Sequence, residues 1–452
     1  FWIPLILLFA LRNRNSAAPL LRRALDGSTL PLALLVAGCW LSDGPVGVMA
    51  CYMLAAVALA ASLLSRSWAH LLRASIAAAL GIALAAFYII PAAWEQRWVD
   101  LRAAIDYPVF RIENNWLFAR HTDTVLAPFG MMVYRTSTLA VSMTTVAALG
   151  LLVLYLRRKF SLQNGPAPRS PEQLEEKTPL ARRWWIPLAL IPAAVLFLQF
   201  PVSLPIWNLL PKLRFLQYPW RWVLVLEAPM AIFFAAAVWP SRSARRWQRA
   251  TVASVCGLFF LAATAWAATT FLRVCQEGDT IADLLAMVRG GGGLEGTDEY
   301  EPPGTDHWKI ATGLPDACLT ADADTTLGIV GEGDSIPNWQ PDQRSCEATV
   351  IAQLRQPEHL RIATVAAHPG FLILRLLSYP AWRITVNGQP AAPLPARDDG
   401  LIAVPVPQGP VDLRVDWTTT SDAVAGRWLS GLTLVLLVGL GLLERKHSSP
   451  RL

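Results

Sequence analysis

The chain has 452 residues, of which 54% are hydrophobic and 16% are charged, and its formal net charge is +6. A water-soluble protein of this length does not combine so few charges with several apolar runs that approach the roughly 20 residues needed to cross a bilayer. The composition therefore excludes a soluble enzyme and predicts a polytopic membrane protein.

Charge divides the chain into two parts. Residues 273–425 contain 10 Lys and Arg against 21 Asp and Glu, a net charge of −11, whereas the remainder contains 29 against 12, a net charge of +17. The basic excess lies among the apolar runs, so we expect a basic membrane-embedded part and an acidic soluble part. We expect no nucleic-acid partner.

Hydropathy predicts about nine membrane-spanning helices. The first is short because residue 1 is Phe and lies inside an apolar run, so we expect the chain to be truncated at its N-terminus. The predicted segments are residues 1–11, 30–42, 46–64, 74–94, 136–156, 184–204, 222–240, 251–272 and 426–443.

The connections between these segments predict their orientation. Residues 12–23, 157–183 and 241–250 carry four, seven and four Lys and Arg, and the tail 444–452 carries three. Alternation places these four on one side of the membrane, and the positive-inside rule makes that side the cytoplasm. The acidic part, 273–425, is then expected to be extracytoplasmic.

The acidic part is expected to contain two regions. Residues 273–347 are rich in turn residues and predict an irregular or mixed segment with a few short helices, whereas residues 348–425 alternate with period 2 and predict an antiparallel β-sandwich that leads into the last span. Leu372, Leu374, Ile384 and Val386 are expected to point inward. Turns are expected at Asn387-Gly388, Asp399-Gly400 and Gln408-Gly409.

Three of the six cysteines fall within predicted spans and three in the acidic part. Oxidation is permitted in an extracytoplasmic domain. Cys318 and Cys346 flank one loop-rich segment and form the favoured disulfide, although Cys275 could pair instead.

Residues 205–222, PIWNLLPKLRFLQYPWRW, interrupt the apolar pattern with three prolines and many aromatic rings. Proline breaks a continuous helix, and Trp and Tyr collect where hydrocarbon meets headgroups, so we expect an interfacial or re-entrant segment. Arg214 and Arg221 could grip a phosphate in bidentate fashion. Alternatively, both arginines only anchor helix ends by snorkelling.

Other polar residues are expected at the same membrane face. Asp43 or Glu95 could act as a general base for an acceptor hydroxyl, and Arg97 could join the arginines and Tyr218 of residues 205–222 in binding a donor phosphate. The alternative is that they are ordinary loop charges. The sequence motifs of soluble nucleotide-binding, hydrolytic and zinc enzymes are absent.

One acidic stretch is a candidate metal site. GTDEYEPPGTD places several hard oxygen ligands close together, so a divalent cation is the one cofactor that the sequence suggests. The simpler interpretation is a solvated acidic loop. The candidate ligands are Asp298, Glu299, Glu301 and Asp306.

Five motifs are distributed along nearly the whole chain. They are LSDGP, AFYIIPAAWEQRWV, LRFLQYPWRW, GTDEYEPPGTD and LSYPAWRITVNGQPAAPLPARDDGLIAVPVPQGPVDLRVDW. The more specific pieces are the Tyr-Pro-Ala-Trp segment with the following Asn-Gly turn and the Gln-Tyr-Pro-Trp-Arg motif. Together these motifs resemble the YfhO-like bacterial membrane proteins, and most closely the branch labelled 6-pyruvoyl-tetrahydropterin-synthase-related membrane proteins.

This resemblance implies the GT-C architecture of glycosyltransferases that take sugars from polyprenyl-phosphate donors outside the cytoplasm. In that superfamily the catalytic acid usually follows the first span, which here would place it before Phe1. The resemblance extends the donor-phosphate role to Arg214 and Arg221. It also implies the cytoplasmic membrane of a bacterium.

Two functions are therefore expected from the sequence. The first is an inverting transferase that moves a sugar from a lipid-phosphate carrier to an envelope glycan, glycolipid or protein, since arginine donors suit a leaving phosphate. The second is a non-catalytic glycolipid-binding envelope protein or transporter whose β-sandwich binds carbohydrate or a partner.

Overall fold

A computed structural model divides the chain into two compact units. We call them the helical unit (Phe1–Ile90, Ile105–Phe271 and Ala425–Leu452) and the sheet unit (Pro91–Ala104 and Leu272–Val424). The structure describes residues 2–12, 27–101, 103–122, 124, 126–164, 179–240, 244–271, 280–283, 285, 301–305, 315–325, 350–356 and 358–448.

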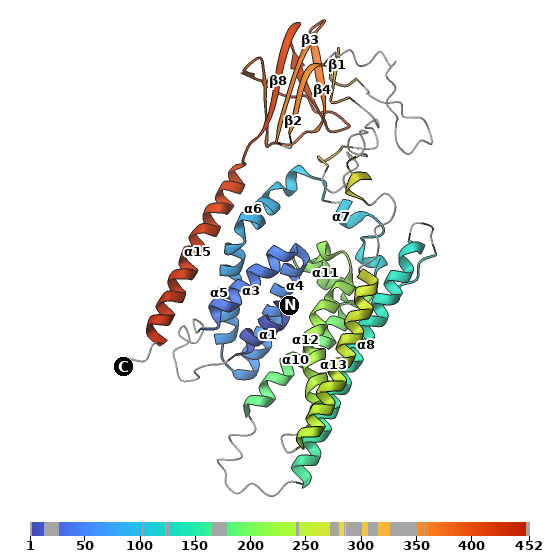
Figure 1. Ribbon diagram of the computed structural model, residues 1–452, viewed down its shortest axis with the longest axis vertical. Coiled ribbons are helices and arrows are strands. Elements are labelled where there is room, and N and C mark those ends of the chain that lie inside the picture. Colours follow the sequence, from blue (N-terminus) through green and yellow to red (C-terminus); the bar gives the residue numbers. More distant parts are fainter. Residues whose placement is uncertain are drawn as a thin grey trace. The chain divides into compact units, whose positions relative to one another are not determined.

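Long apolar helices form most of the helical unit (Figure 1). Two helices, α6 and α15, continue from one unit into the other. The helices are α1 (Trp2–Leu11), α3 (Thr29–Ser42), α4 (Gly44–Ser65), α5 (Ala69–Leu84), α6 (Ala86–Trp94), α8 (Ala127–Asn164), α10 (Pro179–Phe197), α11 (Leu204–Leu209), α12 (Val223–Val238), α13 (Arg246–Phe271) and α15 (Ser421–Ser448).

Five of the described helices are long and apolar enough to cross a membrane, and the number rises to seven if each of two bent pairs counts as one span. The chain thus has the helices of a multi-pass membrane protein. Each of the nine predicted spans falls on a helix, but α1 and α3 have only 10 and 14 residues. A 14-residue helix is about 21 Å long, shorter than the roughly 30 Å hydrocarbon core, so nine spans stay a prediction.

The predicted span 74–94 is broken in the middle. α5 and the helical segment that follows it meet at 79°, with Ala85 between them. The break leaves the backbone N–H of Phe87 outside the helical ladder, and the Ser430 hydroxyl of α15 accepts it at 2.9 Å. Gly426 lies one turn earlier on α15, where an added Cβ would come within 2.6 Å of the Ala86 carbonyl oxygen. A small residue is therefore required at this contact.

Small residues also bring other helices of this unit close together. A Cβ added to Gly81 of α5 would lie 2.6 Å from the Ala33 carbonyl oxygen of α3. A Cβ added to Gly150 of α8 would lie 2.8 Å from the Phe233 carbonyl group of α12. Close backbone approach at small residues is how helices gain packing contacts in a membrane, where lipid already solvates apolar side chains.

Two antiparallel sheets form most of the described sheet unit. One has the strand order β1-β4-β7 and the other the order β2-β3-β8-β5-β6. Side chains from both sheets share one hydrophobic core, as in a β-sandwich. The strands are β1 (Ala317–Thr320), β2 (Val350–Gln356), β3 (His359–Ala366), β4 (Gly370–Leu377), β5 (Trp382–Val386), β6 (Gln389–Pro390), β7 (Leu401–Val406) and β8 (Gly409–Trp417).

The period-2 alternation predicted the inward side chains correctly. Leu372, Leu374 and Ile384 lie in the shared core and Val386 packs against it. Asn387 and Gly388 form the two-residue turn between β5 and β6, with φ of 51° and 82°. The tightest hairpin turns require positive φ at both positions, which explains why the Asn-Gly pair predicted a turn here.

One strand was not predicted. β1 lies in the region expected to be irregular, and it pairs with β4 through Cys318 opposite Ile373. Both of these side chains belong to a second core on the outer face of the smaller sheet. Four residues are too few to show a period, and their partner strand is some 50 residues away, so local pattern does not reveal this strand.

We expect Gly150→Ala to destabilise the protein by about 1–3 kcal/mol, because its Cβ has no space beside the Phe233 backbone. The measurement is the thermal midpoint of the purified chain in detergent. Gly257→Ala on α13 is the matched control, since nothing lies within 4 Å of its added Cβ. Equal midpoints for the two variants would contradict the close approach of α8 and α12.

Candidate functional site

Residues 205–222, which we call the aromatic-basic segment, fold as short turns in the helical unit. α11 is followed by the 3-10 turns η4 (Leu213–Leu216) and η5 (Pro219–Trp222). Lys212 and Gln217 flank η4, and both have φ of 61°. Non-glycine residues in this conformation are strained, and such strain gathers at ligand clamps and switches. The predicted interruption of the helix is therefore present, and it is held in an unusual backbone conformation.

Arg214 is held by two side chains in this segment and its surroundings. Its Nε donates to Asn208 Oδ1 at 2.7 Å, and its Nη2 forms an ion pair with Glu113 Oε1. The side chains of Arg214 and Glu113 are 33% and 38% exposed, so solvent screens this pair. The sequence analysis did not predict Glu113. The one indication in the sequence was that residues 95–135 contain as many carboxylates as arginines.

Arg221 lies beside aromatic rings. Its guanidinium carbon is 5.2 Å from the centroid of the Tyr218 ring, which also stacks on Trp220. Burial raises the pKa of Tyr218, and the charge of Arg221 opposes that shift. The indole N–H groups of Trp220 and Trp222 are buried and have no acceptor among the described residues. The segment thus presents a cation and two unused donors.

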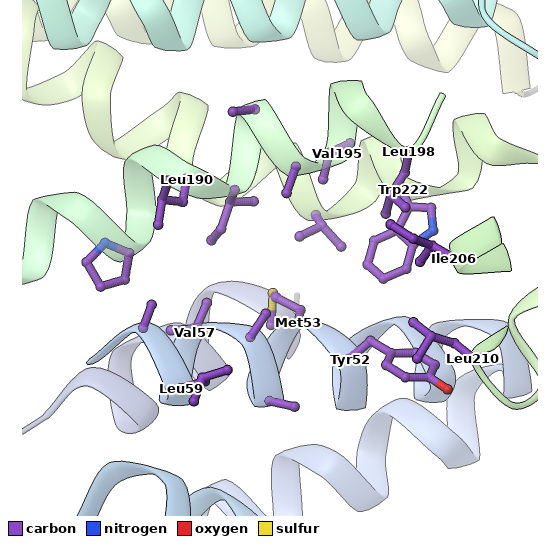
Figure 2. A pocket seen from close by; sticks show the side chains of 18 of the residues that line it. Tyr52, Met53, Val57, Leu59, Leu190, Val195, Leu198, Ile206, Leu210 and Trp222 are labelled. Atoms are coloured by element: carbon purple, nitrogen blue, oxygen red, sulfur yellow. The ribbon is translucent and has the colours of Figure 1, made fainter. Parts of the chain in front are cut away.

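An apolar cavity of about 690 Å³ lies between α4 and α10 (Figure 2). Met53 and Val57 line it from α4, and Leu190 and Val195 face them from α10. The aromatic-basic segment closes one end. The residues there are Tyr52, Ile206, Leu210, Leu213 and Trp222, and the Tyr52 hydroxyl donates to the Pro211 carbonyl oxygen at 2.8 Å.

Asp43 lies at the junction of α3 and α4, also in the helical unit. It has extended backbone angles, and its backbone caps both helices, but its side chain is exposed and makes no capping hydrogen bond. No hydrogen bond or ion pair of its carboxylate occurs within the described part of the chain. Its oxygens are therefore available to a ligand.

The structure places the other predicted residues, Glu95 and Arg97, in the sheet unit. Both belong to the 3-10 turn η1 (Glu95–Trp98). The Arg97 guanidinium lies over the rings of Trp94 and Trp98, at 4.2 and 5.1 Å from their centroids. The predicted set is thus divided, with Asp43, Arg214, Tyr218 and Arg221 in one unit and Glu95 and Arg97 in the other.

Glu95 accepts hydrogen bonds with both carboxylate oxygens. Tyr379 Oη donates to Oε2 at 2.7 Å, and Thr420 Oγ1 lies 3.2 Å from Oε1. Tyr379 also stacks on Trp417 and meets the edge of Trp98. Burial, together with the negative charges of Glu95 and Asp422, raises the pKa of Tyr379, so this hydroxyl stays protonated and keeps donating.

The predicted metal ligands are only partly within the described residues. Asp298, Glu299 and Asp306 lie outside them. Glu301 is 5% exposed, and its carbonyl oxygen accepts the Asp100 N–H at 2.8 Å. Within the described ranges, no group of three or more Asp, Glu, His or Cys side chains is arranged to hold a metal ion.

No model of a known protein family, no curated protein and no solved structure matches this chain. The resemblance to YfhO-like proteins is carried by the sequence motifs alone and stays a prediction. The candidate site is therefore argued from the geometry of the chain itself.

We expect Tyr379→Phe to lower the free energy of unfolding by about 1–2 kcal/mol, because Glu95 loses a donor to a charged oxygen. Above about pH 10, Tyr379 ionises in the unfolded chain but stays protonated in the folded chain, so the free energy of unfolding of the parent chain should fall as the pH rises. The variant lacks this hydroxyl, so its free energy of unfolding should fall less. Thermal midpoints measured across that range test both statements.

The control for this prediction is Tyr107→Phe, whose exposed ring contacts only Phe110 among the described residues. It should leave the midpoint unchanged. If the Tyr379 variant matches the Tyr107 variant at every pH, the bond to Glu95 does not contribute to stability.

Proposed function

We propose that the protein is an integral membrane glycosyltransferase of the GT-C type, which transfers a sugar from a polyprenyl-phosphate donor to an extracytoplasmic acceptor. The observation that carries this proposal is the apolar cavity between α4 and α10, one end of which is closed by the aromatic-basic segment. A ligand that fits both features has a long apolar chain and an anionic head. A polyprenyl phosphate has both.

The cavity suits the chain of such a lipid. Its lining extends along α10 from Pro187 to Val195 and ends at Leu198, just past the helix, which at 1.5 Å per residue is about 16 Å. Its volume of about 690 Å³ falls within the range of roughly 300–1,000 Å³ that is usual for ligand pockets. The lining residues are almost all aliphatic, so several isoprene units could be buried away from water there.

The aromatic-basic segment suits the phosphate. Arg221 contacts only the Tyr218 ring among the described side chains, and the indole N–H groups of Trp220 and Trp222 lack acceptors. Arg214 already binds a carboxylate, but a screened ion pair contributes only about 0–1 kcal/mol. A phosphate that accepts both donors of the guanidinium fork could replace Glu113 at low cost.

The transfer needs one base. The acceptor hydroxyl oxygen forms a bond to the anomeric carbon, the bond from that carbon to the phosphate oxygen breaks, and its electron pair leaves with the polyprenyl phosphate. The hydroxyl proton goes to a carboxylate, and the configuration at the anomeric carbon inverts. Asp43 suits this role better than Glu95, because Tyr379 already donates to one oxygen of Glu95, whereas the Asp43 carboxylate has no partner among the described residues. The arginines stabilise the charge that develops on the phosphate.

Location in a bacterial cytoplasmic membrane with the sheet unit outside fits this function, since the acceptor would be an envelope glycan, glycolipid or protein. The excess of Lys and Arg in residues 157–183 and 241–250 supports that orientation. Cys318 is disulfide-bonded, and its partner is not among the described residues, so the pairing with Cys346 stays a prediction. A disulfide supports an oxidising compartment for this unit.

We expect cysteines at Gln408 and at Arg66 to react from opposite sides of the membrane. Gln408 lies in the exposed turn between β7 and β8, and Arg66 is an exposed residue between α4 and α5. In intact cells, an impermeant maleimide should label Gln408→Cys and spare Arg66→Cys until the membrane is permeabilised. The parent chain gives the background from its native cysteines, and labelling of both in intact cells would reject the orientation.

We expect Arg214→Lys and Arg221→Lys each to lower the transfer rate about 10- to 150-fold, because lysine keeps the charge but loses the fork, at roughly 1.5–3 kcal/mol per charge-assisted contact. The assay follows transfer from a polyprenyl-phosphate sugar in membranes that carry the protein. Arg66→Lys is the control and should transfer at the parent rate, since Arg66 is exposed on the α4–α5 turn.

A further variant separates the roles at this site. Glu113→Gln removes the carboxylate that competes for Arg214, so it should raise transfer at limiting donor up to about fivefold. If both arginine variants transfer sugar at the parent rate, the two arginines only anchor helix ends, and the proposed donor site is wrong. Binding of the donor without any transfer would instead favour the non-catalytic glycolipid-binding protein.

A further inference from the structure

Two carboxylates of the sheet unit share one hydroxyl group. Thr420 Oγ1 lies 3.2 Å from Glu95 Oε1 and 3.2 Å from Asp422 Oδ2. Thr420 directly precedes α15, and Asp422 lies in the first turn of that helix. A hydroxyl has a single proton, so it cannot fully satisfy two ionised carboxylates at once. This cluster therefore holds more negative charge than its own donors balance.

Asp422 gives a second, independent indication. The residue is only 7% exposed, and its Oδ1 atom is buried without any hydrogen-bond partner in the described part of the chain. No Lys or Arg among the described residues contacts Asp422 or Glu95, and Arg97 lies on its tryptophan rings instead. A buried carboxylate with no counter-charge is strongly unfavourable. A bound cation would supply the missing charge.

We propose that Glu95, Thr420 and Asp422 form a binding site for a divalent cation of the calcium type. Calcium binds oxygen ligands at about 2.3–2.6 Å. Two oxygens 3.2 Å apart that each lie about 2.4 Å from one ion subtend an angle of about 84° at it, which suits six to eight ligands. The side chains supply Oε1 of Glu95, Oγ1 of Thr420 and both oxygens of Asp422, and water completes the shell.

The ligand chemistry favours calcium over magnesium. Magnesium requires near-ideal octahedral geometry at short distances, whereas calcium accepts an irregular set that includes a bidentate carboxylate. The Tyr379 hydroxyl fixes the other oxygen of Glu95, so Oε1 is oriented toward Thr420. With two carboxylates, the expected affinity is that of extracellular modules, on the order of 10⁻⁴–10⁻³ M.

The aromatic rings around the cluster provide a direct assay. Tyr379 stacks on Trp417 with ring centroids 5.4 Å apart, and Trp98 meets Tyr379 at 5.3 Å. Terbium occupies calcium sites and emits when a nearby tryptophan transfers energy to it. Full-length protein, purified in detergent and treated with a chelator, should therefore show sensitised terbium emission that calcium displaces. Calcium, but not matched sodium chloride, should also raise its thermal midpoint.

Variants decide whether this site is responsible. Glu95→Gln and Asp422→Asn should each weaken calcium binding about tenfold or more, since ligand charge sets affinity. Asp416→Asn is the matched control, because that carboxylate pairs with His359 on the exposed face of a strand. If Asp422→Asn does not fold, Thr420→Val, which keeps both carboxylates and removes the bridging oxygen, serves in its place and should weaken calcium binding.

Three results would overturn the proposal. One is a parent chain whose emission and midpoint do not respond to calcium. Another is emission that is displaced equally well from the double variant of Glu95 and Asp422, which would locate the ion elsewhere in the acidic part. The third is a midpoint that ignores calcium and falls as the pH rises from about 4 to 8, where carboxylates lose a shared proton and tyrosine does not yet ionise.

Discussion

Backbone polar groups in apolar surroundings need partners within the protein, and this requirement explains where the polar side chains of the helical unit lie. At three breaks between described helices, a freed N–H or C=O group has a hydroxyl or indole group beside it. Ser430 accepts the Phe87 N–H at the break after α5, and the Tyr52 hydroxyl donates to the Pro211 carbonyl oxygen. Trp207 Nε1 donates to the Leu198 carbonyl oxygen at 3.1 Å, where α10 ends. The aromatic-basic segment can therefore leave the helical conformation, and the cavity between α4 and α10 ends against it.

Local pattern predicted the elements, whereas contacts between distant residues were not predictable from it. Hydropathy located the long helices, because an apolar run has few alternatives to a membrane helix. It did not reveal the bend at Ala85, since the nearest proline, Pro91, lies six residues further on and inside α6. The pairs Arg214–Glu113 and Tyr379–Glu95 are 101 and 284 residues apart, and no spacing rule in one sequence connects them. The sequence could therefore name Arg214 and Glu95 as candidates without revealing that each already has a partner.

The motifs that suggested a family have different structural roles. In the Tyr-Pro-Ala-Trp segment, Tyr379 binds Glu95, the Ala381 carbonyl oxygen accepts the N–H and the hydroxyl of Thr418, and Trp382 meets Trp417 edge to face. These contacts fix the end of β8 and the turn η1 within the sheet unit. The Gln-Tyr-Pro-Trp-Arg motif instead supplies the ring beneath Arg221 and the buried indole N–H of Trp220. The first motif orients a carboxylate through packing, and the second presents donors.

The left-handed residues at the ends of η4 have a consequence for evolution. Lys212 and Gln217 each adopt a backbone conformation that only glycine enters without steric cost, and such strain is of order 1–3 kcal/mol per residue. Selection for stability alone would place glycine at both positions. Glycine, however, would let the turn that carries Arg214 sample many conformations. The strained residues thus exchange thermodynamic stability for a loop of fixed conformation, and a search for thermostable variants of this chain would be expected to recover glycine there first.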